Sequence, residues 1–301
     1  MRKLTIGFLA LTALGSMSTA RAADFADDYL RGPEYEPVTT QVIDWSGFYI
    51  GGHGGYSSSA FGFTNSFQPI VANALRSTTI ESEMNASSLL SAHAVRKDGV
   101  SYGAFAGYNM QFDDTVIGVE FDYSRFDITG TTADAISRTR LLSDGYLSTA
   151  NLAGIARTKL EDLGTIRARV GYAIGDFLPF VTGGFAIGRA SISDKVGIQT
   201  YSYDRTTYLS NVASGQTAYV GRFGYSSFDQ ANPGAGIPFA PSIYGTSKTK
   251  VVGGFTLGGG VEYAITSNIL LRGEYQYVLL NDFDGHKVNV NSVRGGAAYK
   301  F

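Results

Sequence analysis

The sequence predicts an all-β fold, an eight-stranded antiparallel transmembrane β-barrel with short periplasmic turns and long extracellular loops. Three observations lead to this prediction. Apolar and polar side chains alternate with a period of two along most of the chain, as they do in strands with two different faces. The alternating stretches are about ten residues long, which is the length of a tilted membrane strand. Short and long connections follow one another in turn, as in outer-membrane barrels.

The chain of 301 residues begins with a stretch typical of a secretory signal peptide. Arg2 and Lys3 precede an apolar run, and Ala20, Arg21 and Ala22 form a small-x-small cleavage pattern. An uncleaved anchor is the alternative, but the run is shorter than the roughly 20 residues that span hydrocarbon. We therefore expect a signal peptide at 1–22, an acidic periplasmic N-terminal tail at 23–44 and an outer-membrane β-barrel at 45–301.

Composition excludes several classes of function. The chain has no cysteine, which removes disulfides, thiolate metal sites and thiol nucleophiles. Without the signal peptide, 21 basic and 26 acidic residues remain, a net charge of −5 that argues against nucleic acid as a partner. No later window is apolar enough for a transmembrane helix. Export combined with alternating strands predicts the Gram-negative outer membrane.

The predicted strands and connections follow from the alternation. The strands are 45–56, 100–112, 115–126, 164–174, 178–191, 250–265, 269–280 and 291–301. The joins after the second, fourth and sixth strands are the short turns DDT, IGDF and TSN. The other connections, about 57–99, 127–156, 192–249 and 281–288, are predicted to be external loops, with short helical pieces in 76–98 and 133–161. An even number of strands can close into a ring, which hydrocarbon requires because it cannot satisfy free backbone groups.

The glycine-rich first strand, WSGFYIGGHGGY at 45–56, has two interpretations. Glycines inside a strand let a small barrel curve and pack a crowded interior. A nucleotide-binding loop would need GxGxxG or GxxxxGK[ST] spacing followed by a helix. Neither is present here or in GGFTLGGG at 253–260, so we interpret these glycines as part of the barrel.

Charged residues on the predicted inner faces form the main candidate site. They are Glu120, Asp122, Arg167, Arg169, Glu262, Arg272, Glu274 and Arg294. The interior of an eight-stranded barrel is only wide enough for side chains, so these charges must pair with one another. We expect a salt-bridged plug; the alternative is a narrow ion path gated by rearrangement of the bridges. Mutual neutralisation also explains Glu262 and Glu274 better than an acid/base dyad does, and no GxSxG stretch is present. We therefore expect no enzyme activity, no cofactor and no metal.

Several stretches resemble a known family. DWSGFYIGGHGGY, LPFVTGGFAIG, GGFTLGGGVEYAITSNILLRGEYQYV and the ending VRGGAAYKF are similar to the small outer-membrane β-barrel proteins of alphaproteobacteria. This family of major surface antigens (porin family) has an OmpA-like transmembrane barrel and includes hemin-binding relatives. The resemblance implies that Val293, Tyr299 and Phe301 form the C-terminal signal read by the barrel assembly machinery during biogenesis. It also raises hemin ligation by His93 or His286, although both fall at loop or loop-edge positions, where solvation at the surface is the commoner fate.

Further surface residues have predicted roles. Trp45, Tyr49, Tyr102, Tyr108, Tyr123, Tyr263 and Tyr299 suit aromatic girdles at the membrane interfaces. Trp45 and Tyr49 share a parity opposite to that of Phe48, so by phase they can instead face inward. Arg125 and Arg189, at the external ends of apolar faces, are candidate contacts for lipopolysaccharide phosphates, with plain solvation at the rim as the alternative.

The long loop at 192–249 and the fold together suggest a function. The loop places six tyrosines among Ser, Gly and Asn, which is the composition of a recognition surface or of a disordered loop. We expect a structural outer-membrane barrel that contributes to envelope integrity and contacts outer-membrane lipid, lipopolysaccharide and host or surface ligands through its loops. The alternative is a narrow porin or a hemin-binding uptake protein.

Overall fold

A computed structural model describes residues 43–301, and the predicted signal peptide and nearly all of the predicted tail lie outside them. Eight long strands dominate the structure: β1 (Gly47–Phe63), β2 (Val95–Phe112), β3 (Thr115–Leu141), β4 (Tyr146–Tyr172), β5 (Phe177–Asp204), β9 (Ser242–Ala264), β10 (Ile269–Leu280) and β11 (His286–Lys300). Among the described residues, none of the helices is long and apolar enough to cross a membrane.

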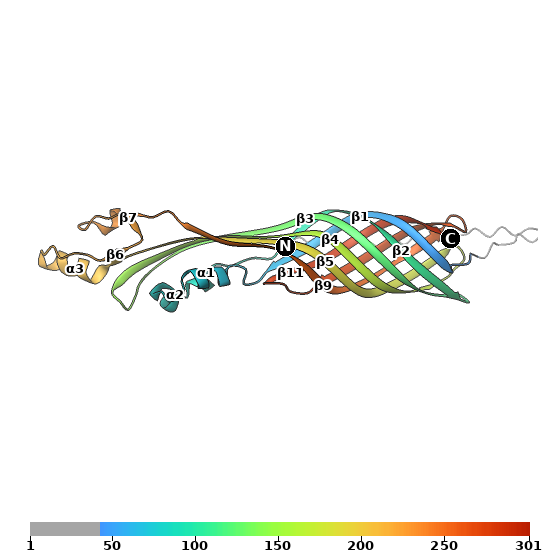
Figure 1. Ribbon diagram of the computed structural model, residues 1–301, viewed down its shortest axis with the longest axis horizontal. Coiled ribbons are helices and arrows are strands. Elements are labelled where there is room, and N and C mark those ends of the chain that lie inside the picture. The colour runs from blue at the N-terminus through green and yellow to red at the C-terminus, as the bar shows by residue number, and fades with distance from the viewer. Residues whose placement is uncertain (1–42) are drawn as a thin grey trace, which may run out of the picture. The chain divides into compact units, whose positions relative to one another are not determined.

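The eight long strands form a closed antiparallel ring. Each pairs with its neighbour along the chain, and β1 pairs with β11 to complete the circle. Figure 1 shows this ring as the crossing ribbons around the label β2, with the C-terminus at its right-hand end. The predicted fold class is confirmed, because every strand of the ring has two partners and none has a free edge within it.

The outward face of the ring is apolar, as hydrocarbon requires. Along β3 the exposed side chains are Ile117, Val119, Phe121 and Tyr123, and the buried positions between them are Gly118, Glu120 and Asp122. The same alternation continues on the other strands. The periplasmic turns are tight, with Asp113 and Gly175 at positive φ.

Two glycines of β1 are needed for the crowded interior. An added Cβ at Gly51 would lie 2.5 Å from the ring of Phe105, and one at Gly55 would lie 2.3 Å from the carbonyl oxygen of Val293. Gly54 faces outward, and an added Cβ there would meet nothing within 4 Å. The interpretation of a barrel strand therefore holds for the inward glycines, where a side chain would collide with the neighbouring strands β2 and β11.

Four strands continue far beyond the ring, and here two predictions from the sequence were wrong. Residues 127–156 and 192–249 were predicted to be loops. Nearly all of 127–156 instead belongs to β3 and β4, and 192–204 and 242–249 belong to β5 and β9. Beyond the last pairs with β2 and β10, these strands make a four-stranded sheet of residues 127–141, 146–161, 190–204 and 242–253, which we call the outer sheet. At about 3.3 Å per residue, residues 127–141 extend about 50 Å.

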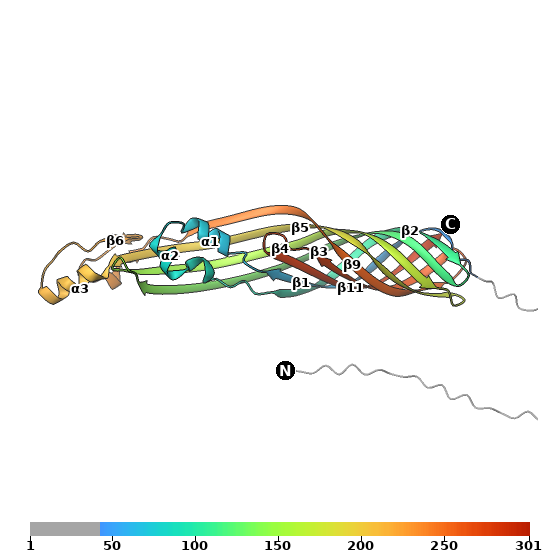
Figure 2. The same cartoon turned by 90° about the horizontal axis from the view of Figure 1, so that it is seen from below.

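A helical segment between β1 and β2 covers one face of the outer sheet (Figure 2). It contains α1 (Gln68–Ala74), α2 (Thr79–Met84) and the short η1 (Ala86–Ser88). Phe67, Val71 and Leu75 of this segment join Leu152 and Ile192 of the sheet in one hydrophobic cluster. The predicted helical pieces in 76–98 thus exist, whereas the pieces predicted in 133–161 do not, because that segment is strand.

The far end of the outer sheet carries a small irregular cap, which we call the distal tip (residues 205–241). It comprises α3 (Arg205–Ser214), β6 (Arg222–Phe223), β7 (Tyr225–Ser227), η2 (Pro233–Ala235) and β8 (Ile237–Pro238). In Figure 1 it lies at the end opposite the C-terminus.

At the periplasmic end, two residues predicted for the aromatic girdle face inward. Trp45 is fully buried and packs with Ile43, Tyr49 and Leu178 inside the ring. The girdle prediction for Trp45 and Tyr49 is therefore wrong, and the inward orientation that their parity allows is the one observed. Their rings fill the periplasmic end of the barrel, where the wall offers many small side chains.

Candidate functional site

The eight charged residues predicted to face inward all lie inside the ring. They come from five strands: Glu120 and Asp122 from β3, Arg167 and Arg169 from β4, Glu262 from β9, Arg272 and Glu274 from β10, and Arg294 from β11. The strand register sets acids opposite arginines on neighbouring strands, pairing Glu120 with Arg167, Glu262 with Arg272, and Glu274 with Arg294. Opposite charges directly across a strand pair attract one another, so this register favours the closed ring.

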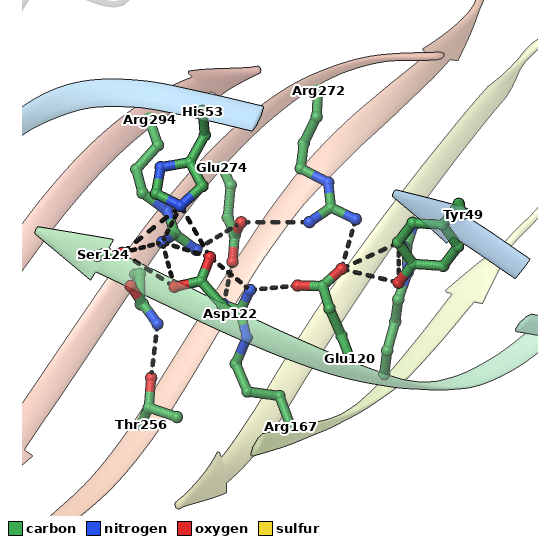
Figure 3. Close-up of polar contacts among 12 residues, drawn as sticks. Tyr49, His53, Glu120, Asp122, Ser124, Arg167, Thr256, Arg272, Glu274 and Arg294 are labelled. Carbon is green, nitrogen blue, oxygen red and sulfur yellow. Dashed lines mark hydrogen bonds and ion pairs between the residues drawn. The ribbon is translucent and has the colours of Figure 1, made fainter. Parts of the chain in front are cut away.

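Further ion pairs cross the lumen and join the strands into one network (Figure 3). Arg272 Nη2 lies 2.6 Å from both Glu120 Oε2 and Glu262 Oε1. Arg167 donates to Glu120 and Glu274, and Arg169 donates to Glu262. The network contains four arginines and four carboxylates, so it neutralises itself, as buried charges must in a low-dielectric interior.

Asp122 joins Arg294, His53 and Ser124 to the network. Arg294 Nη1 lies 3.1 Å from both oxygens of Asp122, and its Nη2 donates to Glu274 Oε2 at 2.9 Å. His53 Nε2 lies 2.9 Å from Asp122 Oδ2, and the Ser124 hydroxyl donates to Asp122 Oδ1 at 2.9 Å. The Asp122 carboxylate is thus contacted by a guanidinium, an imidazole and a hydroxyl from three strands.

Aromatic rings complete the network, and the sequence alone did not identify them. The Tyr49 hydroxyl donates to Glu120 Oε2 at 2.8 Å. The guanidinium carbon of Arg272 lies 4.1 Å from the ring centre of Phe105, and that of Arg169 lies 4.2 Å from the ring centre of Phe180. These contacts cover the faces of the guanidinium groups that the carboxylates leave free. The sequence signal that could have identified them was the alternation within each strand, which places these three rings on the inward face.

This arrangement closes the lumen. Glu120, Arg167, Arg169 and Glu262 are inaccessible to solvent, so water does not reach the layer in which they pair. The side chains of this layer are covered by one another and by the rings of Tyr49, Phe105 and Phe180. Within residues 43–301, no group of three or more metal-ligating side chains is arranged to hold a metal ion.

The histidines raised for hemin are differently placed. His93 is exposed. His286, predicted at a solvated loop position, is instead fully buried at the start of β11. Its Nε2 lies 2.9 Å from Asp194 Oδ2, and its Nδ1 lies 2.7 Å from Thr158 Oγ1. Both ring nitrogens of His286 are therefore engaged, and neither is free to bind iron.

Charged residues at the outer rim lie on the outside of the wall. Arg125 pairs with Asp162 at 3.4 Å and Arg189 pairs with Glu161 at 3.2 Å, and both arginine side chains are 58% exposed. Tyr102, Tyr108, Tyr123, Tyr263 and Tyr299 are exposed on the outward face, as are Val293 and Phe301 near the C-terminus. These positions are compatible with the interfacial and assembly roles predicted for them.

An aromatic cluster lies where the distal tip meets the end of β5. Tyr203 packs edge-on against Tyr208, and Tyr225 packs against Tyr201 and Phe228. Burial in this cluster raises the pKa of Tyr225 to about 12. The segment 192–249 therefore consists of strands and a cap. Four of its six tyrosines, Tyr201, Tyr203, Tyr208 and Tyr225, lie together near its far end.

Asp204 begins the helix α3 of the tip. Its Oδ1 accepts a hydrogen bond from the backbone N–H of Thr207 at 2.9 Å, and its Oδ2 accepts one from the Thr207 hydroxyl at 2.6 Å. These hydrogen bonds hold the pKa of Asp204 below its usual value. An acidic N-cap of this kind satisfies backbone donors that the helix itself leaves free.

Comparisons with known proteins agree with this fold. The family model described as "Outer membrane protein beta-barrel domain" matches residues 7–301. The chain is 29% identical to the 31 kDa outer-membrane immunogenic protein of Brucella melitensis, over 97% of this chain and 98% of that protein. It is 25% identical to the 22 kDa outer membrane protein of Rhizobium leguminosarum bv. viciae, over 85% of this chain and 78% of that protein.

Among solved structures, the outer membrane protein OprG from Pseudomonas aeruginosa is 13% identical, with a TM-score of 0.37 over 85% of this chain and 96% of that one. At this score the likeness adds nothing to the assignment. The match of the family model to nearly the whole chain carries it, and the closed ring of eight strands agrees with it. The chain therefore belongs to the outer membrane β-barrel protein family and resides in the outer membrane.

Proposed function

We propose that this chain is a non-catalytic surface protein whose sealed barrel anchors a stiff outer sheet and presents the distal tip to the cell's surroundings. The observation that carries this proposal is the length of the outer sheet, since residues 127–141 and 190–204 continue beyond the ring as paired strands. A hydrophobic cluster with α1 and α2 supports that sheet. Loops that only connected strands would not need such a support.

The sealed lumen favours an anchoring role over transport. The self-neutralising layer around Arg272 and Glu120 joins strands from opposite sides of the ring. Cross-barrel ion pairs hold the wall in one shape, which supports a contribution to envelope integrity. Purified protein in planar bilayers is therefore expected to give no stepwise conductance, and steady channel events in the wild-type protein would contradict this part of the proposal.

The display role can be tested by shortening the outer hairpin. Ile198 and Ser242 are already register partners, so residues 199–241 can be replaced by an Asn-Gly turn that closes β5 onto β9. The shortened protein should still assemble and shift in gel mobility on heating. Attachment of cells carrying it to epithelial layers should fall well below that of cells with equal amounts of the full-length barrel. Equal attachment would contradict the display role.

Lipid and assembly contacts form the rest of the proposal. Arg125 and Arg189 lie beside the apolar band at the outer rim, which supports contacts with lipopolysaccharide phosphates. The outward Val293, Tyr299 and Phe301 on the last strand support recognition by the barrel assembly machinery. Removing the terminal Phe301 should lower the amount of barrel that reaches the outer membrane, and an unchanged amount would contradict that role.

A further inference from the structure

The distal tip contains a cavity between α3 and the segments 216–219 and 230–231. Its volume is about 410 Å³, within the roughly 300–1,000 Å³ typical of small-ligand pockets. Tyr208 and Asn211 of α3 form one wall, and Gln216, Tyr219 and Gln230 contribute to the opposite side. Because α3 lies at the end of the molecule farthest from the barrel (Figure 1), this cavity opens where an external ligand arrives first.

The walls of the cavity are fixed by hydrogen bonds. Asn211 Nδ2 donates to the carbonyl oxygen of Ala218 at 2.6 Å, which ties α3 to the opposite wall. Gln230 Oε1 accepts from the backbone N–H of Val220 at 2.8 Å. Tyr208 is held by the edge of Tyr203, with ring centres 6.1 Å apart. A site held in this way loses little conformational freedom when a ligand binds.

The lining has a specific chemical character. None of the residues that line the cavity is charged. The guanidinium of Arg222 lies beside it, over one face of the Tyr219 ring at 5.8 Å from the ring centre, and donates to the Tyr219 hydroxyl at 3.3 Å. Two tyrosine rings supply flat apolar surface, with the negative face that aromatic rings present. Amide and hydroxyl groups lie beside the rings, and within residues 43–301 no hydrogen bond engages the side chains of Gln216 and Thr217 or the hydroxyl of Tyr208.

This combination matches one class of ligand. A sugar ring has a face of C–H groups with partial positive charge, which packs on an aromatic face. Around its edge it has hydroxyl groups that both donate and accept, and amide side chains do the same. We propose that this cavity binds a neutral saccharide, with Tyr208 and Tyr219 against the sugar ring and Gln216 and Thr217 bonded to its hydroxyl groups. The inference rests on the proposed display function and specifies its ligand.

The test uses outer-membrane vesicles that carry the full-length protein. Vesicles are applied to an array of neutral oligosaccharides ending in galactose, glucose or N-acetylglucosamine, with heparin fragments on the same array. Wild-type vesicles should bind a subset of the neutral sugars, and the free sugar should compete. Tyr208→Ala should raise the vesicle concentration needed for half-maximal binding about three- to tenfold, which is the loss expected for one aromatic contact.

Matched variants separate contact from folding. Tyr208→Phe keeps the ring and should retain most of the binding, and Tyr219→Trp should retain it as well. Gln216→Ala should weaken binding without disturbing the aromatic cluster. Tyr244→Ala, which removes an exposed tyrosine of β9 outside the cavity, is the control and should bind as the wild type does.

Three results would overturn the inference. They are no binding to any neutral sugar, binding that survives both Tyr208→Ala and Gln216→Ala, and binding to heparin alone that is lost in Arg222→Ala. Comparing sugar binding with the attachment of cells that carry the hairpin-shortened variant distinguishes failure of the saccharide proposal from failure of the display proposal. If shortening lowers attachment while the array stays empty, the display function stands and the saccharide is wrong. If wild-type vesicles bind sugars but shortening leaves attachment unchanged, the display function is wrong.

Discussion

The ring and the outer sheet share the four strands β3, β4, β5 and β9 but bury opposite kinds of side chain. On β4 within the ring, Arg167 and Arg169 point inward while Ile166 and Val170 face out. In the part of β4 that belongs to the outer sheet, Leu152, Ala156 and Leu160 are buried. The outward face there carries residues such as Arg157. The side on which a strand places its apolar residues is therefore set by the surrounding solvent.

The change occurs at a definite point in the strands. Glu161 is an extra residue on β4, since Leu160 pairs with Ala190 and Asp162 pairs with Arg189. This irregularity shifts the parity of β4, so that Leu163 and Leu160 both face inward despite their odd spacing. Arg125, Asp162 and Arg189 form a charged row at the same level. We propose that this row marks the level at which the wall passes from hydrocarbon to water.

The largest expected effect comes from opening the interior network. Arg272→Met removes a guanidinium that Glu120 and Glu262 share. The buried network then carries one uncompensated negative charge, which should lower the free energy of unfolding by about 3–5 kcal/mol. Arg189→Met removes a guanidinium from an exposed pair and should cost less than about 1 kcal/mol. Urea titration in detergent, followed by the heat-dependent shift in gel mobility, measures both. Adding Glu262→Gln to Arg272→Met should recover part of the loss. Equal midpoints for the two single variants would mean that the network does not stabilise the barrel.

The outward faces of the two regions should differ almost as much. Ile166→Lys places a charge on the lipid-facing side of β4 and should cost about 2–4 kcal/mol near the middle of the membrane. Ala153→Lys makes a similar change on the outward face of the outer sheet and should cost at most about 0.5 kcal/mol. The same urea titration compares them. If Ala153→Lys is as costly as Ile166→Lys, the outer sheet does not lie in water.

The core of the outer sheet should respond to the loss of methyl groups. Val71→Ala, in the fully buried side of α1, should destabilise the helical segment by about 1.5–2 kcal/mol, from roughly 0.8 kcal/mol per buried methylene and a cavity contribution. Val212→Ala, at an exposed position of α3, is the matched control. Limited proteolysis should cut 65–94 faster in Val71→Ala, with the barrel still shifting in mobility on heating. Unchanged cleavage would argue against the hydrophobic cluster as the support of the sheet.

The smallest effect concerns the cap of α3. Asp204→Ala should destabilise this helix by about 1 kcal/mol, and Asp204→Asn by less. Because the pKa of Asp204 is lowered in the folded protein, its contribution is complete above the unfolded value of about 3.9 and is lost as the pH falls through the lower folded value. The chemical shift of the Thr207 amide should follow this titration in the wild type and should not in Asp204→Asn. A wild-type titration at or above the unfolded value would contradict the cap.

The predictive power of the sequence also differed between the two regions. Within the ring, alternation identified the strands and all eight inward charges, because hydrocarbon outside and crowding inside leave each position a narrow choice. The outer sheet was missed because its strands are rich in Thr, Ser and Ala, which is also typical of loops. Its apolar side is revealed only by the helices that cover it. Trp45 was misassigned because aromatic residues near a strand end serve equally well as girdle or as filling, and only the parity of the strand distinguishes the two.

The most direct test of the change from lipid to water is a cysteine scan along β4. The natural chain contains no cysteine, so single cysteines at 153, 157, 166, 168 and 170 can be labelled without background. A membrane-impermeant maleimide applied to intact cells should label 153 and 157 and leave 166, 168 and 170 unlabelled, and a lipid-soluble probe should reach the last three. Aqueous labelling of 166 and 170 to the same extent as 153 would show that water surrounds the whole strand. It would contradict the account of a lipid-embedded ring with an outer sheet in water.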